Sequence, residues 1–185
     1  MKATLHTLCL SLCILLAMQG CSRKNEAAVI HSLSSMNQLG LVEYRVRKII
    51  KADDPGEWYK IGDRKILLSC TAYLKAGIDL AGFSPEEDIV IDRRKGKVSI
   101  TLPHATLLSL DIPPSEIRQE YDQVTLLRSA FSVQERNQLL RQGERQIRRS
   151  VPSLGILEEA EANARKFFES AFYKMDFKEV EVTFK

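Results

Sequence analysis

The feature that most constrains the fold is a long run, from Ile66 to Leu80, in which apolar residues alternate with other types. Every even-numbered position is apolar: Ile66, Leu68, Cys70, Ala72, Leu74, Ala76, Ile78 and Leu80. A period of two places these side chains on one face of a β-strand. The run therefore predicts one long strand, or two strands in line, with one buried face. Gly77 marks the place where a strand of this length is expected to bend or bulge.

Shorter runs repeat this alternation, with turn residues between them. They are 42–46, 89–91, 98–102, 108–112 and 180–184. Alternation on one side only is typical of an antiparallel sheet with one solvated face. The segment DRRKGK at 92–97 predicts a tight hairpin between two of these strands.

Three segments are predicted to be helical. The first covers residues 27–39, the second covers 132–149 and opens with the capping-box sequence SVQE, and the third covers 156–173 with an apolar stripe. Gly143 in the second helix predicts close packing against a neighbour, because glycine otherwise costs about 1 kcal/mol relative to alanine. We expect an α+β fold: a largely antiparallel sheet with one face covered by two C-terminal helices and a short N-terminal helix.

The N-terminus predicts a secretory signal peptide. Lys2 gives a positive start, and an apolar run of about ten residues at 8–17 follows, too short for the roughly 20 that span a bilayer. Gly20 directly precedes Cys21, and this pattern resembles the lipobox of bacterial lipoproteins. Cleavage there would leave Cys21 as an acylated, palmitate-carrying N-terminus. The alternative is an ordinary signal peptide.

The predicted organisation is a signal peptide at 1–20, a lipidated tether at 21–27 and a single α+β domain at 28–185. Ser22 resembles the residue after the cysteine in lipoproteins delivered to an outer membrane, so we expect an outer-membrane lipoprotein that faces the periplasm. The signal removes one lysine and no acid, which lowers the net charge from +3 to +2. This bias is too small to imply nucleic acid as a partner.

Motifs for metal, cofactor or nucleophilic chemistry do not occur in the sequence. It has no CxxC, no cluster of His and Cys, no GxSxG and no phosphate-binding glycine loop. After cleavage and acylation, Cys70 is the one cysteine left, so no intramolecular disulfide is expected. We therefore expect no cofactor and no metal.

One group of candidate interaction residues lies on the odd-numbered faces of two predicted strands. It contains Lys75, Asp79 and Asp111. Asp79 either accepts backbone N–H groups at a strand end, as aspartate does near turns, or pairs with Asp111 as a catalytic carboxylate. The second interpretation would make the protein an envelope hydrolase, and a cleft that holds both carboxylates would support it.

A second group covers much of the second helix. Arg141, Arg145, Arg148 and Arg149 lie there with few acidic residues to offset them. The plain interpretation is a solvated helix face. In a membrane-tethered protein, the alternative is docking on anionic headgroups or on an acidic envelope partner.

Several phrases together resemble the bacterial domain-of-unknown-function 4230 family. They are KILLSCTAYLKAGIDLAGF, VSITLPHATLLSLDI, ERNQLLRQGERQIRR, GILEEAEANARKFFESAF and FKEVEVTF, and the resemblance runs from about Leu41 to Lys185. It implies a lipoprotein signal or a single membrane anchor, and it assigns no activity and no functional residue. A more distant similarity of architecture to band-7 (stomatin-like) domains implies oligomeric scaffolding at a membrane.

The function predicted from these features is a lipid-anchored envelope protein with a non-enzymatic binding or scaffolding role. The partners expected are the membrane, through the N-terminal lipid, and an unidentified envelope protein or anionic ligand. Two alternatives remain at this point: the hydrolase that uses acidic residues on the open sheet face, and a self-assembling scaffold at the membrane.

Overall fold

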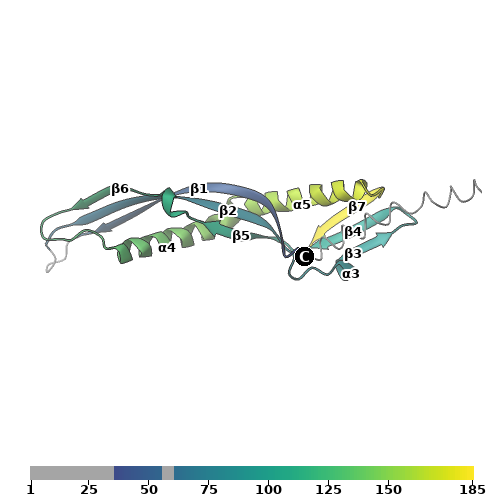
Figure 1. Ribbon diagram of the computed structural model, residues 1–185, viewed down its shortest axis with the longest axis horizontal. Helices are drawn as coiled ribbons and strands as arrows, with labels where there is room; N and C mark the ends of the chain where they lie inside the picture. Colours follow the sequence, from purple (N-terminus) through teal and green to yellow (C-terminus); the bar gives the residue numbers. More distant parts are fainter. Residues whose placement is uncertain (1–35, 56–60) are drawn as a thin grey trace, which may run out of the picture. The chain divides into compact units, whose positions relative to one another are not determined.

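A computed structural model describes residues 36–55 and 61–185 (Figure 1). The elements are β1 (Gln38–Asp54), β2 (Arg64–Asp79), α3 (Pro85–Asp88), β3 (Ile89–Asp92), β4 (Lys97–Leu102), β5 (Ala105–Asp111), η2 (Pro114–Glu116), β6 (Ile117–Val124), α4 (Val133–Ser150), η3 (Val151–Ser153), α5 (Ile156–Tyr173) and β7 (Glu179–Phe184). These strands and helices confirm the α+β class.

The chain divides into two compact units that interleave along the sequence. Unit 2 contains Gly40–Ile78 and Ala105–Asn163, and unit 1 contains Asp79–His104, Ala164–Lys185 and residues 36–39 of the described chain. The signal peptide and tether lie outside the described residues, and the single-domain assignment stays a prediction.

The sheet of unit 2 is organised around β2. One edge of β2 pairs with β1, and the other pairs with β6 over Arg64–Cys70 and with β5 over Tyr73–Ile78. The even-numbered side chains of β2 from Ile66 to Ile78 are all buried, which confirms the long strand predicted from alternation. The ladder with β5 shifts register between Lys75 and Ala76, immediately before Gly77, where a bend was expected.

Side-chain pairs align β1 with β2. Lys75 Nζ lies 3.7 Å from Glu43 Oε1, and Lys65 Nζ lies 3.7 Å from Asp53 Oδ2. The paired residue on β1 changes from Glu43 to Asp53, towards the C-terminus, while the paired residue on β2 changes from Lys75 to Lys65, towards the N-terminus. That is the register of an antiparallel hairpin. These odd-numbered residues mark the open face of the sheet.

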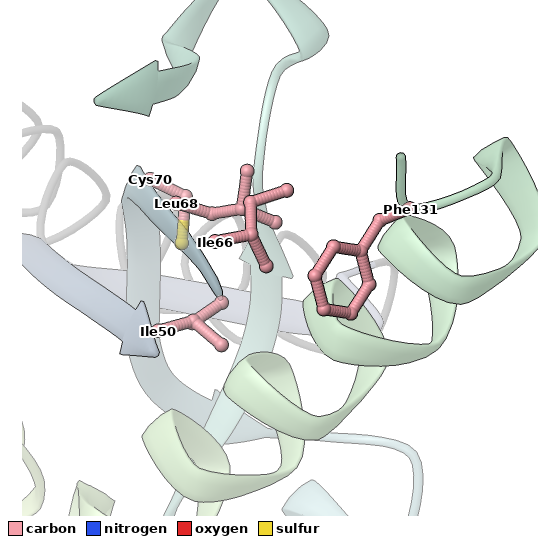
Figure 2. Packing of buried hydrophobic residues seen from close by; sticks show 5 residues of the cluster. All are labelled: Ile50, Ile66, Leu68, Cys70 and Phe131. Atoms are coloured by element: carbon pink, nitrogen blue, oxygen red, sulfur yellow. The ribbon is translucent and has the colours of Figure 1, made fainter. Parts of the chain in front are cut away.

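The core of unit 2 lies on the even-numbered face, beneath α4. Its central cluster is Ile50, Ile66, Leu68, Cys70 and Phe131, shown in Figure 2. Leu139 and Leu140 of α4 pack against this cluster, and burial raises the pKa of the Cys70 thiol.

Gly143 provides the closest approach of α4 to the sheet. A Cβ at this position would lie 2.4 Å from Cδ1 of Ile50 and 2.9 Å from its Cγ1, well inside normal carbon–carbon contact. Close packing at Gly143 is thus confirmed.

The start of α4 is the capping box predicted from SVQE. The Ser132 hydroxyl accepts from the Glu135 N–H at 3.3 Å, and the Ser132 N–H donates to Glu135 Oε2 at 2.8 Å. These two bonds satisfy backbone donors that a helix N-terminus leaves without partners.

The sheet of unit 1 has the order β3-β4-β7. The β3–β4 hairpin forms as predicted, and Gly96 occupies its turn at φ +66°, a conformation that glycine adopts without strain. β4 and β7 pair in parallel, in contrast to the antiparallel pairing that predominates in the molecule. A parallel pair needs a long crossover, and here the connection includes all elements from β5 to α5.

The C-terminal half of α5 contributes aromatic residues to unit 1. Phe168 and Phe172 are buried with ring centroids 6.3 Å apart, and Phe177 packs edge-on against Phe172 at 6.0 Å. The bounds 156–173 predicted for this helix are confirmed. The apolar stripe predicted for this helix includes Phe167, and that part of the prediction is wrong, because Phe167 is 49% exposed.

The first predicted helix is wrong at its C-terminal end. Gln38 and Leu39 are the first residues of β1, and Gly40 lies inside this strand rather than at a helix end. The preceding residues, 27–35, lie outside the described residues. β6 was not predicted, because its residues IRQEYDQV form an edge strand without an apolar period.

Candidate functional site

The two candidate carboxylates do not converge on a described site. Asp79 Oδ1 accepts the Ala81 N–H at 3.0 Å, which is the strand-end role that aspartate has near turns. Asp111 lies opposite Tyr73, six positions before Asp79 on β2. At a strand rise of about 3.3 Å per residue, this offset is about 20 Å along β2, too far for a catalytic pair.

Lys75 is occupied within the open sheet face. Besides its contact with Glu43, its side chain passes over Gly40, where a Cβ would lie only 2.2 Å from Lys75 Cε. Gly40 therefore leaves the space that the aliphatic part of the Lys75 side chain occupies. We interpret Lys75 as a cross-strand partner rather than a ligand-binding residue.

The arginines of α4 differ in their surroundings. Arg141, Arg145 and Arg149 are exposed at successive i,i+4 positions, and none has an ion-pair partner within the described residues. Arg148, by contrast, binds Glu144 at 3.1 Å. The exposed face of α4 thus carries three guanidinium groups that have no ion-pair partner in the described part of the chain, here called the arginine row.

The first-turn carboxylate of α4 is held by the sheet. Glu135 accepts from Arg64 of β2 at 2.6 Å and from the Ser132 N–H. The Arg64 hydrogen bond, followed by the Ser132 bonds, lowers the pKa of Glu135 to about 2. Glu135 and Glu144 are the acidic residues of α4, and both have partners, so neither offsets the arginine row.

Arg64 also belongs to a wider ionic network. Its Nε binds Asp54 Oδ2 at 2.7 Å, Arg128 binds the same carboxylate oxygen, and the Arg64 guanidinium lies 4.3 Å from the centroid of the Phe131 ring. Hydrogen bonds, first from Arg64 and then from Arg128, lower the pKa of Asp54. The network ties the β1–β2 hairpin to the start of α4.

A shallow groove of about 390 Å³ runs along α4 in unit 2. It is lined by Ile112, Ile117, Asn137, Leu140, Arg141 and Glu144. Its apolar residues also pack on the core cluster, so the groove is a depression over the core and not a deep pocket. Arg141 places one end of the arginine row at its rim.

Sequence analysis missed an exposed apolar group at the end of unit 2 where α4 begins. Its members and their exposed fractions are Ile61 59%, Val124 37%, Leu126 78%, Leu127 85% and Val133 72%. We call this group the apolar end. The sequence signal that could have located it is the adjacent pair of leucines, which fits no strand or helix period and precedes a helix cap.

Across residues 36–55 and 61–185, no group of three or more His, Cys, Asp or Glu side chains is placed to hold a metal ion. In the same residues, no helix combines the length and the apolar character needed to cross a bilayer.

Comparison with known proteins gives one match. The family model described as "Protein of unknown function (DUF4230)" matches residues 31–182. No curated protein and no solved structure matches the chain, and nothing in these comparisons supports a link to band-7 proteins. Because the match covers most of the chain, the protein belongs to the DUF4230 family.

Proposed function

We propose that this protein is a lipid-anchored binding module of the cell envelope, which docks on anionic membrane headgroups through the arginine row of α4. In this proposal the lipid on Cys21 holds the chain to the membrane, and the row orients unit 2 against it. The docking is non-enzymatic.

The observation that carries the proposal is the unpaired state of the row. Like charges at i,i+4 destabilise a helix by about 0.2–0.5 kcal/mol per pair. The helix dipole stabilises the charge of Arg149, which lies in the last turn of α4. It does not stabilise Arg141 and Arg145, which lie further from the C-terminus. Their cost to the fold is not offset by an ion pair with any described residue, which favours an anionic partner.

The magnitude of headgroup attraction fits an anchored protein. A basic residue near an anionic leaflet contributes about 1 kcal/mol, so three arginines alone would bind weakly. The lipid anchor raises the effective concentration of the row at the membrane, and stable membrane attachment generally needs two such signals.

The hydrolase alternative is not part of this proposal. Asp79 is used in a turn, and Asp111 lies beside Tyr73 on the open sheet face.

Vesicle binding tests the docking surface. We would compare the full chain with Cys21→Ser, which cannot be acylated, on phosphatidylglycerol-containing and on purely zwitterionic vesicles. Binding should require the anionic lipid and weaken with salt. Arg141→Gln with Arg145→Gln should weaken it roughly 10- to 30-fold, from about 1 kcal/mol per arginine.

A matched control removes the same charge elsewhere. Arg94→Gln with Lys95→Gln neutralises two exposed cations in the β3–β4 turn of unit 1. Binding should stay close to that of the parent. Equal losses in both variants would mean that net charge, not the arginine row, directs binding, and the proposal would fail.

The anchor has its own test. Mass spectrometry of the mature N-terminus should find an acylated Cys21, and Cys21→Ser should release the protein from the membrane fraction. A mature chain that starts elsewhere or lacks lipid would contradict the anchor.

A further inference from the structure

Five of the eleven large apolar residues that are exposed in the described chain belong to the apolar end. Its members come from three connected places: the start of the segment before β2, the end of β6 with the loop that follows, and the first residue of α4. Single exposed apolar residues are normal, whereas several on neighbouring segments indicate a contact surface. The segments are neighbours here, because Asp63 bonds to Thr125 and Arg64 bonds to Glu135.

Hydrogen bonds hold the two loops of the apolar end together. The Asp63 N–H donates to Thr125 Oγ1 at 2.7 Å, and the Thr125 N–H donates to the Asp63 carbonyl at 2.9 Å. Gly62 fits against this turn, since a Cβ there would lie 2.2 Å from the Thr125 carbonyl oxygen. The two exposed leucines therefore follow a turn whose backbone is fixed by hydrogen bonds to the segment before β2.

The backbone of Leu126 is itself unusual. Its φ of +55° lies in the left-handed region, which is strained for a residue with a Cβ. The strained conformation directs a large apolar side chain into solvent, so neither backbone preference nor burial within the fold explains a leucine here. Strain of this kind is concentrated at functional sites.

The charges beneath the apolar end cancel one another. Asp54, Arg64, Arg128 and Glu135 form two acid–base pairs through shared contacts. An apolar medium could therefore meet the exposed side chains without stripping water from an unpaired member of this network.

We propose that the apolar end inserts into the interfacial region of the bilayer on which the arginine row docks. Four side chains would enter the boundary between headgroups and acyl chains: Ile61, Leu126, Leu127 and Val133. This inference rests on the proposed function, because the same membrane is the partner of both surfaces.

The geometry of α4 supports a single partner for both surfaces. Val133 is its first residue, and Arg141 follows eight positions later, about 12 Å along the helix axis. The apolar end thus continues the arginine row towards the helix N-terminus. An apolar group beside a basic stripe is the combination by which amphipathic surfaces bind anionic bilayers.

The length of chain before β1 is sufficient for this arrangement. Sixteen residues lie between Cys21 and Gln38, the first residue of β1, and the 17 Cα–Cα steps can span at most about 55–60 Å. β1 has 17 residues and extends about 55 Å at 3.3 Å per residue. The apolar end, at the far end of β1, therefore lies within reach of the membrane that holds the anchor.

The favoured occupant is a bilayer rather than a second protein. The apolar residues project from loops and a helix start, and none of them lines the groove along α4. A projecting apolar group needs a partner with a matching pocket or a medium that deforms around it, and the predicted anchor supplies the medium. A second copy of the chain is the competing occupant that the test must separate.

A tryptophan reporter tests insertion in the full, acylated chain. Trp58 is the single tryptophan, so Trp58→Phe removes the background signal. Leu127→Trp then reports on the apolar end, and Ile49→Trp, at a position 54% exposed on the open face of the same unit, is the matched control. Both proteins are placed in phosphatidylglycerol-containing vesicles whose acyl chains carry bromine.

Insertion predicts emission at shorter wavelength for the reporter at position 127, and quenching by bromine at least several-fold stronger than at position 49. Equal, water-like emission at both positions, together with binding that still depends on Arg141 and Arg145, would overturn the insertion and leave the proposed function standing. Strong quenching at position 127 that survives Arg141→Gln with Arg145→Gln would support insertion while the arginine row fails.

A second measurement excludes self-association. The reporter at position 127 is followed in detergent solution as protein concentration rises, without vesicles. The inference predicts no change. A shift to shorter wavelength together with a concentration-dependent mass would identify a second copy as the occupant and overturn the bilayer assignment.

Discussion

Cations on the β4–β7 sheet of unit 1 and on α4 of unit 2 have opposite surroundings. Lys97 lies 2.8 Å from Glu179 and 3.2 Å from Glu181, and these contacts raise its pKa. Arg141 and Arg145 have no carboxylate partner in the described chain. The comparison separates charges that align strands from charges that remain available to a partner, although all of them are exposed or half-buried.

The largest effect is expected where a cation joins elements of the fold. Arg64→Met removes the arginine partner of Glu135, one of the two arginine partners of Asp54, and the contact over the Phe131 ring. Loss of a partly buried, hydrogen-bonded charge should lower the free energy of unfolding by about 2–3 kcal/mol. Urea denaturation measures it. A change below about 0.5 kcal/mol would mean that the Arg64 contacts contribute no more than exposed surface ion pairs.

Gly143→Ala tests the packing that holds the arginine row in place. The added Cβ would overlap Ile50, so we expect a loss of about 1–3 kcal/mol despite the higher helix propensity of alanine. Gly143→Ala with Ile50→Val makes room and should recover part of the loss. Stabilisation by the single substitution would show that α4 can move away from the sheet at little cost.

Leu126→Gly should raise the free energy of unfolding. It removes left-handed strain from an exposed leucine, so we expect about 1 kcal/mol of added stability, reduced somewhat by the greater freedom of glycine in the unfolded chain. The same protein should insert less well into vesicles. Leu127→Gly is the control, because the backbone of Leu127 is not in the left-handed region. Destabilisation by Leu126→Gly would mean that the leucine serves the fold.

The pH dependence of stability should distinguish the Arg64–Glu135 contact from the arginine row. The Arg64 hydrogen bond lowers the pKa of Glu135 to about 2 from its ordinary value of 4.5. A lowered folded-state pKa gives stability that is present above the unfolded value and lost as pH falls from about 4.5 to 2. Glu135→Gln should flatten that part of the profile, whereas Arg141→Gln should not. An unchanged profile would contradict the Arg64–Glu135 contact.

Elements with a strong local pattern were predictable from the sequence. The period of two in β2, the capping box of α4 and the apolar stripe of α5 all reflect contacts within one segment or with one continuous core. Segments whose secondary structure depends on pairing with residues far away in the sequence were not predictable. β6 is polar and pairs with β2 at an edge, and the parallel partner of β4 lies at the end of the chain.

The candidate site was predictable only in part for the same reason. The sequence identified the arginines of α4, but Glu135 receives its partner, Arg64, from a strand 71 positions away. Which arginines stay unpaired is therefore a property of the tertiary structure. The apolar end is assembled from the segment before β2, the end of β6 with the loop that follows, and the start of α4, so no short window of sequence contains it.

The most direct test of the account measures stability and vesicle binding on the same pair of proteins: the parent chain and Arg141→Gln with Arg145→Gln. We predict binding to anionic vesicles roughly 10- to 30-fold weaker, with the free energy of unfolding unchanged or raised by a few tenths of a kcal/mol as like-charge repulsion is relieved. A loss of stability with binding intact would show that the arginine row serves the fold and would contradict the account.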